Sequence, residues 1–150
     1  MYTLILSIHN LFRWVVIVLA VIAIIRALSG WFANRKWASS DRKIGLFFSI
    51  SMDIQFLLGL LLYIFLSPIT KAAMSDFGAA MSNMELRFFG LEHLFYMLVA
   101  VVFVHLGSVL SRKVNEDAAK HRRAALWFTG AIIIVMLAIP WSRPLFRLPF

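Results

Sequence analysis

Residues 4–28 read LILSIHNLFRWVVIVLAVIAIIRAL, an apolar run in which Arg13 and Arg26 are the only charged residues. About 20 mainly apolar residues in a helix are enough to cross the roughly 30 Å hydrocarbon layer of a bilayer. Three further apolar runs follow at about residues 44–66, 87–110 and 124–139. The sequence therefore predicts an all-α fold, an integral membrane four-helix bundle.

The composition supports the same prediction. Of 150 residues, 62% are hydrophobic, and the mean hydropathy is +0.87, which exceeds what a soluble core of this size needs. Short connections leave room for one domain only, covering residues 1–150. Cysteine is absent, which excludes disulfides, thiolate metal sites and covalent haem attachment through a CxxCH motif.

Basic residues between the runs predict the orientation. The formal net charge of +8 is explained by lipid headgroups at the membrane surface, so no nucleic-acid partner is expected. Ten basic residues flank the first and third connections: Arg26, Arg35, Lys36, Arg42, Lys43, Arg112, Lys113, Lys120, Arg122 and Arg123. The opposite side carries four: Lys71, Arg87, Arg143 and Arg147. The bias predicts both termini on the non-cytoplasmic side of a bacterial inner membrane.

The longest connection, residues 67–84, repeats apolar side chains at helical spacing. Met74, Phe77 and Met81 would lie on one side of a short amphipathic helix covering the non-cytoplasmic end of the bundle. A mobile loop is an equally good interpretation of so short a pattern.

Four histidines fall into two groups by depth. His9 and His93 begin the first and third runs, so both lie toward the non-cytoplasmic side. His105 and His121 lie toward the cytoplasmic side. An ionisable residue inside a membrane normally faces the bundle interior and suggests a functional site.

Two neutral imidazoles at matching depth on different helices are what axial ligation of a b-type haem requires. Arg13, one turn after His9, is placed to pair with a propionate. Gly90 and Ala100 leave little side-chain bulk near His93, which would suit a flat macrocycle. Alternatively, His9 and His93 hydrogen-bond other helices, with Arg13 paired to Glu92 or Glu85, or the site binds a quinone.

A second haem between His105 and His121 is a weaker prediction. His93 and His105 are twelve residues apart, about 18 Å along a helix, and cannot share one haem. His121 lies in the basic run of residues 120–123, which headgroup contacts explain equally well. His105 could instead be a single hydrogen-bonded imidazole.

Asp53 lies near the middle of the second run, with Ser49 one turn before it and Gln55 close by. It is a candidate proton-relay or quinol-protonation group. It could equally be a neutral, buried acid that hydrogen-bonds Ser49 or another span.

Several segments resemble a family of small four-span bacterial membrane proteins labelled cytochrome b-like. They are His9-Asn10-Leu11-Phe12-Arg13-Trp14, Asp41-Arg42-Lys43-Ile44-Gly45-Leu46, Arg87-Phe88-Phe89-Gly90-Leu91-Glu92-His93, Lys120-His121-Arg122-Arg123, Pro140-Trp141 and Arg143-Pro144-Leu145. The resemblance covers nearly the whole chain but leaves His105 outside. The architecture is also similar to cytochrome b561-type and hydrogenase-linked cytochromes.

We therefore expect a membrane b-type cytochrome-like electron-transfer subunit that exchanges electrons with quinone or a partner complex. His9 and His93 are the expected haem b ligands, Arg13 and Arg87 the propionate partners, and Asp53 a proton group. Partners would be lipid and either other subunits of a redox complex or further copies of the chain. The alternatives are a cofactor-free accessory subunit of a respiratory or photosynthetic complex and, less well supported, a small transporter or sensor.

Overall fold

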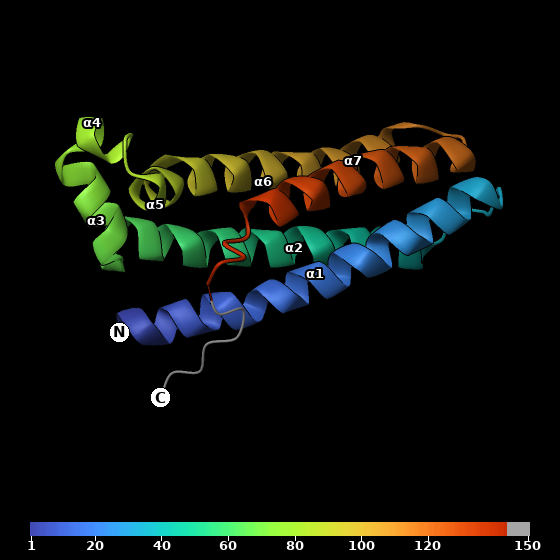
Figure 1. Cartoon of the computed structure of the whole chain (residues 1–150). Coiled ribbons are helices and arrows are strands. Elements are labelled where there is room, and N and C mark those ends of the chain that lie inside the picture. The colour runs from blue at the N-terminus through green and yellow to red at the C-terminus, as the bar shows by residue number, and fades with distance from the viewer. Residues whose placement is uncertain (144–150) are drawn as a thin grey trace.

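Four long antiparallel helical segments form the computed structural model, which describes residues 1–143 (Figure 1). The first two are α1 (Tyr2–Phe32) and α2 (Ser39–Leu61), which continues through the π-helical turn η1 (Leu62–Leu66). The third joins α5 (Met84–Arg87), the π-helical turn η2 (Phe88–Glu92), α6 (His93–Leu110) and the short 3₁₀ turn η3 (Ser111–Lys113). The fourth is α7 (Asp117–Ala138). All four are long and apolar enough to cross a membrane, so the predictions of an all-α fold and of four helices that could span a membrane are confirmed for the described residues.

The helices are longer than the apolar runs at most of their ends. α1 continues past Gly30, and α7 begins seven residues before Ala124. An apolar run marks the part of a helix that contacts hydrocarbon, whereas the helix itself continues through the polar headgroup region. At the end of the second span, Ser67 caps the next helix by accepting a hydrogen bond from the Thr70 amide, and Pro68 takes its first position.

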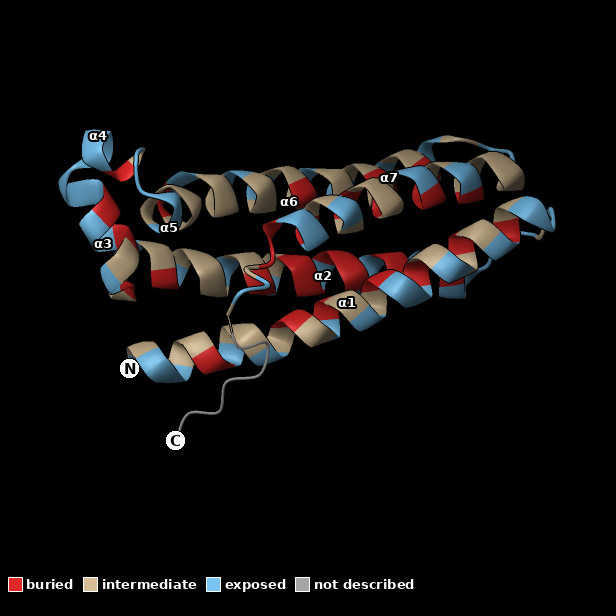
Figure 2. Cartoon of the chain, viewed as in Figure 1, coloured by how far each residue is buried: buried red, intermediate tan, exposed pale blue. Residues whose placement is uncertain are grey.

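Each span packs against two neighbours. α1 and α6 both contact α2 and α7, so α1 and α6 lie diagonally across the bundle. α1 presents small buried residues, including Ala20, Ala23 and Ala27, which let the neighbouring backbones approach closely. Phe48 of α2 meets Phe128 of α7 edge to face, with ring centroids 5.4 Å apart. Figure 2 shows the buried residues concentrated along these contacts.

The end of the bundle that carries the basic connections is held by Asp41. Its carboxylate accepts hydrogen bonds from Arg26 at 2.8 Å and from Arg35 at 2.9 Å. The second of these bonds raises the pKa of the Arg35 guanidinium above its ordinary value, because the carboxylate stabilises the charged form. Asp41 therefore has a structural role, which is to fix the turn between α1 and α2 through Arg26 and Arg35.

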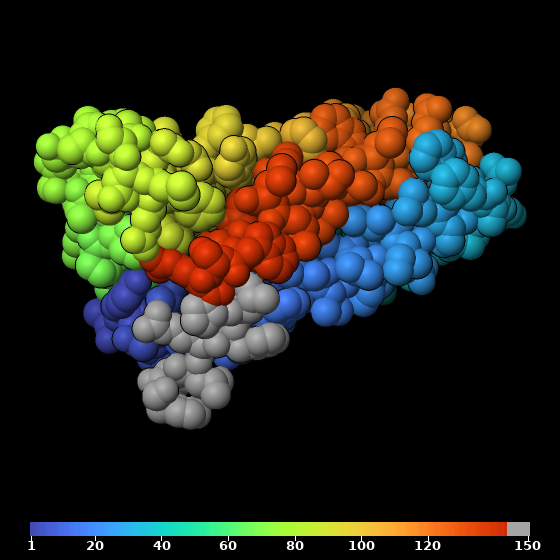
Figure 3. All heavy atoms as spheres, viewed as in Figure 1, coloured from blue at the N-terminus to red at the C-terminus, as the bar shows by residue number. Residues whose placement is uncertain are grey.

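The long connection is mostly helical and lies over the ends of the second and third spans, at the opposite end of the bundle (Figures 1 and 3). It forms α3 (Pro68–Ser75) and α4 (Phe77–Ala80) before α5 begins. The side chains that suggested an amphipathic lid do not form its buried side, because Met74 and Phe77 are exposed while Ala73 and Ala80 are buried. The lid therefore packs through alanines, which allow a closer approach to η2.

Candidate functional site

A cavity of about 150 Å³ lies inside the bundle at the end covered by α3. All four spans contribute to its walls, and so do Ile69 and Thr70 of the lid. Its polar lining residues are Tyr2, His9, Asn10, Arg13, Gln55, Tyr63, Ser67, Thr70, His93 and Arg143. Among the described residues, this lining includes two arginines and no carboxylate, but Glu85, outside the lining, pairs with Arg143. An anionic or electron-rich guest would therefore bind beside Arg13 or replace Glu85 at Arg143.

The structure brings His9 and His93 together across this cavity. Their ring centroids are 6.4 Å apart, and the ring planes are inclined by 70°. His9 comes from α1 and His93 from α6, the diagonal pair of helices, so the rings meet in the bundle interior rather than at a contact between neighbouring helices.

Hydrogen bonds orient both imidazoles. His93 Nδ1 lies 2.8 Å from the carbonyl oxygen of Ala138, and because a carbonyl only accepts, this nitrogen must donate. Gln55 Nε2 donates to the His9 carbonyl at 3.0 Å and lies 3.3 Å from His9 Nε2. The nitrogens left without a hydrogen-bond partner among residues 1–143 are therefore His9 Nδ1, which is buried, and His93 Nε2.

Glycines and π-helical turns shape the walls beside the histidines. A Cβ atom at Gly59 would lie 3.3 Å from His9 Cε1, so this glycine lets α2 pack directly on the imidazole. A hydrogen bond joins η1 and η2, since the Tyr63 hydroxyl donates to the Gly90 carbonyl at 2.7 Å. π-helical turns are frequent at functional sites, and no hydrophobic period in the sequence predicts them.

The predicted role of Gly90 is wrong. A Cβ atom there would lie 2.8 Å from Ala73 Cβ, so this glycine makes room for the lid and not for a macrocycle. Ala100 is buried in the hydrophobic core. A glycine in a helix indicates that another group packs closely against the backbone there, but the sequence does not show which group it is.

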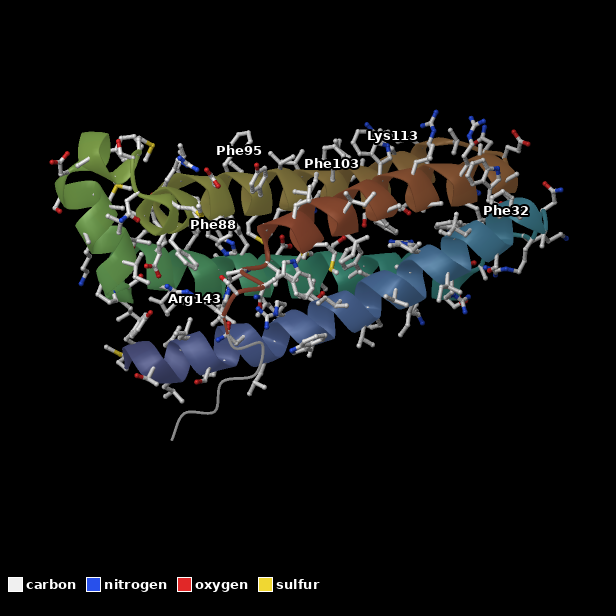
Figure 4. The ribbon with its side chains drawn as sticks, in the orientation of Figure 1. Phe32, Phe88, Phe95, Phe103, Lys113 and Arg143 are labelled. Carbon is white, nitrogen blue, oxygen red and sulfur yellow. The ribbon has the colours of Figure 1, made fainter. Side chains whose placement is uncertain are left out.

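Two arginines contribute positive charge to the cavity. Arg13 is only 8% exposed, and its Cζ lies 5.7 Å from the Trp14 ring centroid. Arg143 follows the end of α7, pairs with Glu85 and lies over the Phe89 ring at 4.4 Å. Figure 4 shows Arg143 and Phe88 toward the lid end of the bundle, with Phe32 and Lys113 toward the other end.

Arg87, the other predicted propionate partner, does not line the cavity. Its Nε donates to Glu92 at 2.7 Å, and its Nη1 donates to the Met81 carbonyl at 3.2 Å. Arg143 reaches the cavity instead because the chain turns back over the bundle after Pro140. Gln55, Tyr63 and Arg143 line the cavity but were not predicted as site residues. Arg143 carried two signals in the sequence, its position on the same side as His9 and its place in one of the family-like segments.

The structure does not bring His105 and His121 together. His105 lies on the outside of α6, where its Nε2 is 2.8 Å from Asp53 Oδ1. His121 is fully buried, with its ring 4.8 Å from that of Trp37 and packed directly on Gly30. The two rings have no common space for a second haem, because one faces outward and the other is enclosed.

Asp53 does not face the cavity either. Gln55 lines the cavity from the same helix, whereas the Asp53 side chain is 42% exposed. Ser49 bonds the Gly45 carbonyl and the Ser108 hydroxyl rather than Asp53. Asp53 therefore has no direct path to a guest beside His9.

Comparison with protein-family models, with curated proteins and with solved structures finds no match to this chain. The case for a function therefore rests on the geometry of the cavity. Within the described residues, no group of three or more His, Asp or Glu side chains could hold a metal ion. A metal bound by the His9–His93 pair would therefore have to bring its remaining ligands with it, as a metal inside a macrocycle does.

Proposed function

We propose that this chain is a membrane electron-transfer protein of the b-cytochrome type, in which His9 and His93 hold one haem b. The observation that carries the proposal is the 6.4 Å separation of the two imidazole centroids. Two metal–nitrogen bonds of about 2 Å, with roughly 1 Å from each nitrogen to its ring centre, give a similar separation of about 6 Å for imidazoles on one metal. Edge-to-face packing of two rings also gives separations of about 4.5–7 Å, so the spacing supports the proposal together with the two imidazole nitrogens that have no hydrogen-bond partner among residues 1–143.

The environment of the rings supports the same proposal. The Ala138 carbonyl accepts from His93 Nδ1, which fixes the tautomer and leaves Nε2 as the basic nitrogen, as second-shell partners do for metal-binding histidines. His9 supplies a buried nitrogen without a partner. Arg13 and Arg143 would pair with the propionates. Bound haem would supply one-electron redox chemistry, while the residues of the chain orient it and exclude water.

The volume of the cavity restricts how haem could bind. Small-molecule sites usually enclose roughly 300–1,000 Å³, whereas this cavity encloses about 150 Å³. The donor atoms and the charge fit haem, but the macrocycle must extend through the open side of the cavity or displace side chains such as Gln55.

Binding of a quinone ring without haem is the second candidate, because this small volume favours it. A quinone carbonyl accepts hydrogen bonds, and Gln55, Tyr63 and the histidines are donors in the lining. A cofactor-free accessory subunit is the third reading, in which the His9–His93 pair only joins the helices.

Extraction of the purified protein separates these candidates. We expect about one haem b per polypeptide and no dependence of that ratio on added quinone. Extraction of quinone without haem would favour the second candidate. Extraction of neither haem nor quinone would favour the cofactor-free accessory subunit.

We also propose that the termini face the outside of a bacterial inner membrane and that the basic connections are cytoplasmic. Ten basic residues on one side against four on the other support this orientation. One of the four, Arg147, lies outside the described residues.

Reporter fusions test the orientation. A periplasm-active reporter at Phe150 should be active, and the same reporter placed after Asn115, between η3 and α7, should be inactive. The matched pair with a cytoplasm-active reporter should give the opposite result. Activity of the cytoplasmic reporter at Phe150 would reverse the orientation.

A further inference from the structure

A hydrogen-bonded polar pair lies on the outer surface of the bundle. His105 Nε2 of α6 is 2.8 Å from Asp53 Oδ1 of α2, and the side chains are 48% and 42% exposed. No described residue bonds to the remaining atoms, His105 Nδ1 and Asp53 Oδ2. The pair joins two neighbouring spans, but His105 Nδ1 and Asp53 Oδ2 have no hydrogen-bond partner within the described part of the bundle.

The pair lies deep in the hydrocarbon layer. Asp53 follows Lys43 by ten residues, about 15 Å along α2, and His105 precedes Arg112 by seven residues, about 10 Å along α6. Lys43 and Arg112 belong to the basic end, where headgroups lie. Water and headgroups at that surface are therefore roughly 10–15 Å away from the pair, in a layer about 30 Å thick.

The exposed surface around the pair is apolar. In the central parts of the spans, residues 8–25, 46–61, 91–109 and 126–137, the residues in the exposed class are Ile, Leu, Val, Phe or Met, apart from His105 itself. On the same helix face as the pair, the exposed neighbours lie seven and three residues before it and four residues after it. They are Leu46, Ile50 and Leu57 on α2, and Leu98, Val102 and Val109 on α6. Asp53 and His105 therefore sit in the middle of two adjacent apolar stripes.

Lipid does not satisfy such a pair. Ionisable residues within membrane spans are costly, and they almost always face a bundle interior, water or another protein group. The cavity cannot supply the missing partners, because α2 presents Met52 and Gln55 to it and Asp53 outward. The face formed by α2 and α6 therefore requires a polar partner from outside the bundle.

We infer that this face binds a second copy of the same chain in the membrane. A twofold axis parallel to the membrane normal places α2 of one copy against α6 of the other. Asp53 and His105 are at the same depth, so each carboxylate then meets the other copy's imidazole. With a proton on His105 Nδ1, this nitrogen donates to Asp53 Oδ2 of the other copy, and the spare atoms of both pairs are satisfied. The face is complementary to itself in charge, whereas an unrelated subunit would have to carry its own matching pair.

The absence of cysteine allows a clean cross-linking test. Ile50→Cys in one tagged copy and Val109→Cys in a differently tagged copy place one thiol on each of the two facing helices, α2 and α6, at similar depth because Ser49 contacts Ser108. In the matched control, Val18→Cys on the exposed side of α1 replaces Ile50→Cys. The two copies are expressed together, and disulfide formation is induced in native membranes. We expect Ile50→Cys with Val109→Cys to join the two tags in one species of twice the mass, at least about tenfold more than Val18→Cys with Val109→Cys.

The polar pair is tested in the same background. Adding Asp53→Leu and His105→Leu removes the reciprocal hydrogen bonds but keeps the apolar surface, so cross-linking should fall about tenfold. The melting temperature of the monomer in detergent checks that this variant folds. Equal cross-linking from Ile50 and Val18, cross-links only to species of another mass, or no effect of the double substitution in folded protein would each overturn the proposal.

Discussion

Replacing either cavity histidine should remove bound haem completely. His9→Ala and His93→Ala each remove one of the two residues that would hold the haem. Because the chain has no cysteine, a CxxCH motif could not keep the haem attached covalently. We expect the haem-to-protein ratio of each variant to fall from about one to below about one tenth, with loss of the low-spin spectrum. The measurement is haem extraction from protein purified in equal amounts.

His105→Ala is the matched control for this experiment. It removes the same side chain from the same bundle, but His105 lies outside the cavity, so the haem ratio should stay at the parent value. If all three variants keep the parent's haem, His9 and His93 are not its ligands. If His105→Ala alone loses haem, the cofactor lies on the outer face and the proposed site is wrong.

Gly30→Ala should destabilise the whole bundle. A Cβ atom at this position would lie 2.3 Å from the Cε1 and Nδ1 atoms of His121. The imidazole is fully buried and packs against Trp37, so it cannot swing away without opening the core. Overpacking of this kind costs about 1–3 kcal/mol, which exceeds the gain of up to about 1 kcal/mol from replacing glycine within a helix.

The melting temperature in detergent should therefore fall by several degrees, at roughly 2–4 °C per kcal/mol for a chain of this size. Gly78→Ala is the control, because its nearest neighbour would be Asp76 Oδ1 at 3.6 Å, an ordinary contact. Adding His121→Ala to Gly30→Ala should recover part of the loss by removing the clash. An unchanged melting temperature for Gly30→Ala alone would show that His121 does not occupy this position.

The fold was predictable because a membrane imposes a simple rule on the sequence. Long apolar runs must be helices when no water is present to bond the backbone. The alternation of helix direction then gave the depth of each histidine, which is why His9 and His93 could be paired before any coordinates were considered. Depth along a helix follows directly from counting residues.

Rotation about the helix axis was much harder to predict. His105 and His121 share a depth range, but one faces outward and the other packs on Gly30. Apolar residues surround the axis of every span, so the few polar residues form no continuous hydrophilic face that shows which way each one points. The rule that ionisable residues face inward predicted the wrong side for Asp53, whose outward position is explained if a second copy covers it.

Contacts made by the connections were the other gap. Arg87 pairs with Glu92 and Arg143 reaches the cavity, although both lie on the lid side. Their positions depend on how the turns after Asn83 and Pro140 direct the chain. The π-helical turns η1 and η2 also shift the register of the second and third spans. Neither effect has a periodic signal in the sequence.

The central claim is that the imidazoles of His9 and His93 hold a redox-active haem between them. The most direct measurement is the reduced-minus-oxidised optical spectrum of the parent protein purified from its own membrane. We predict the sharp absorption bands of a low-spin, bis-histidine b haem, at an intensity that corresponds to one haem per chain. A featureless difference spectrum from folded, pure protein would contradict the claim and leave the cavity to a quinone or to no cofactor.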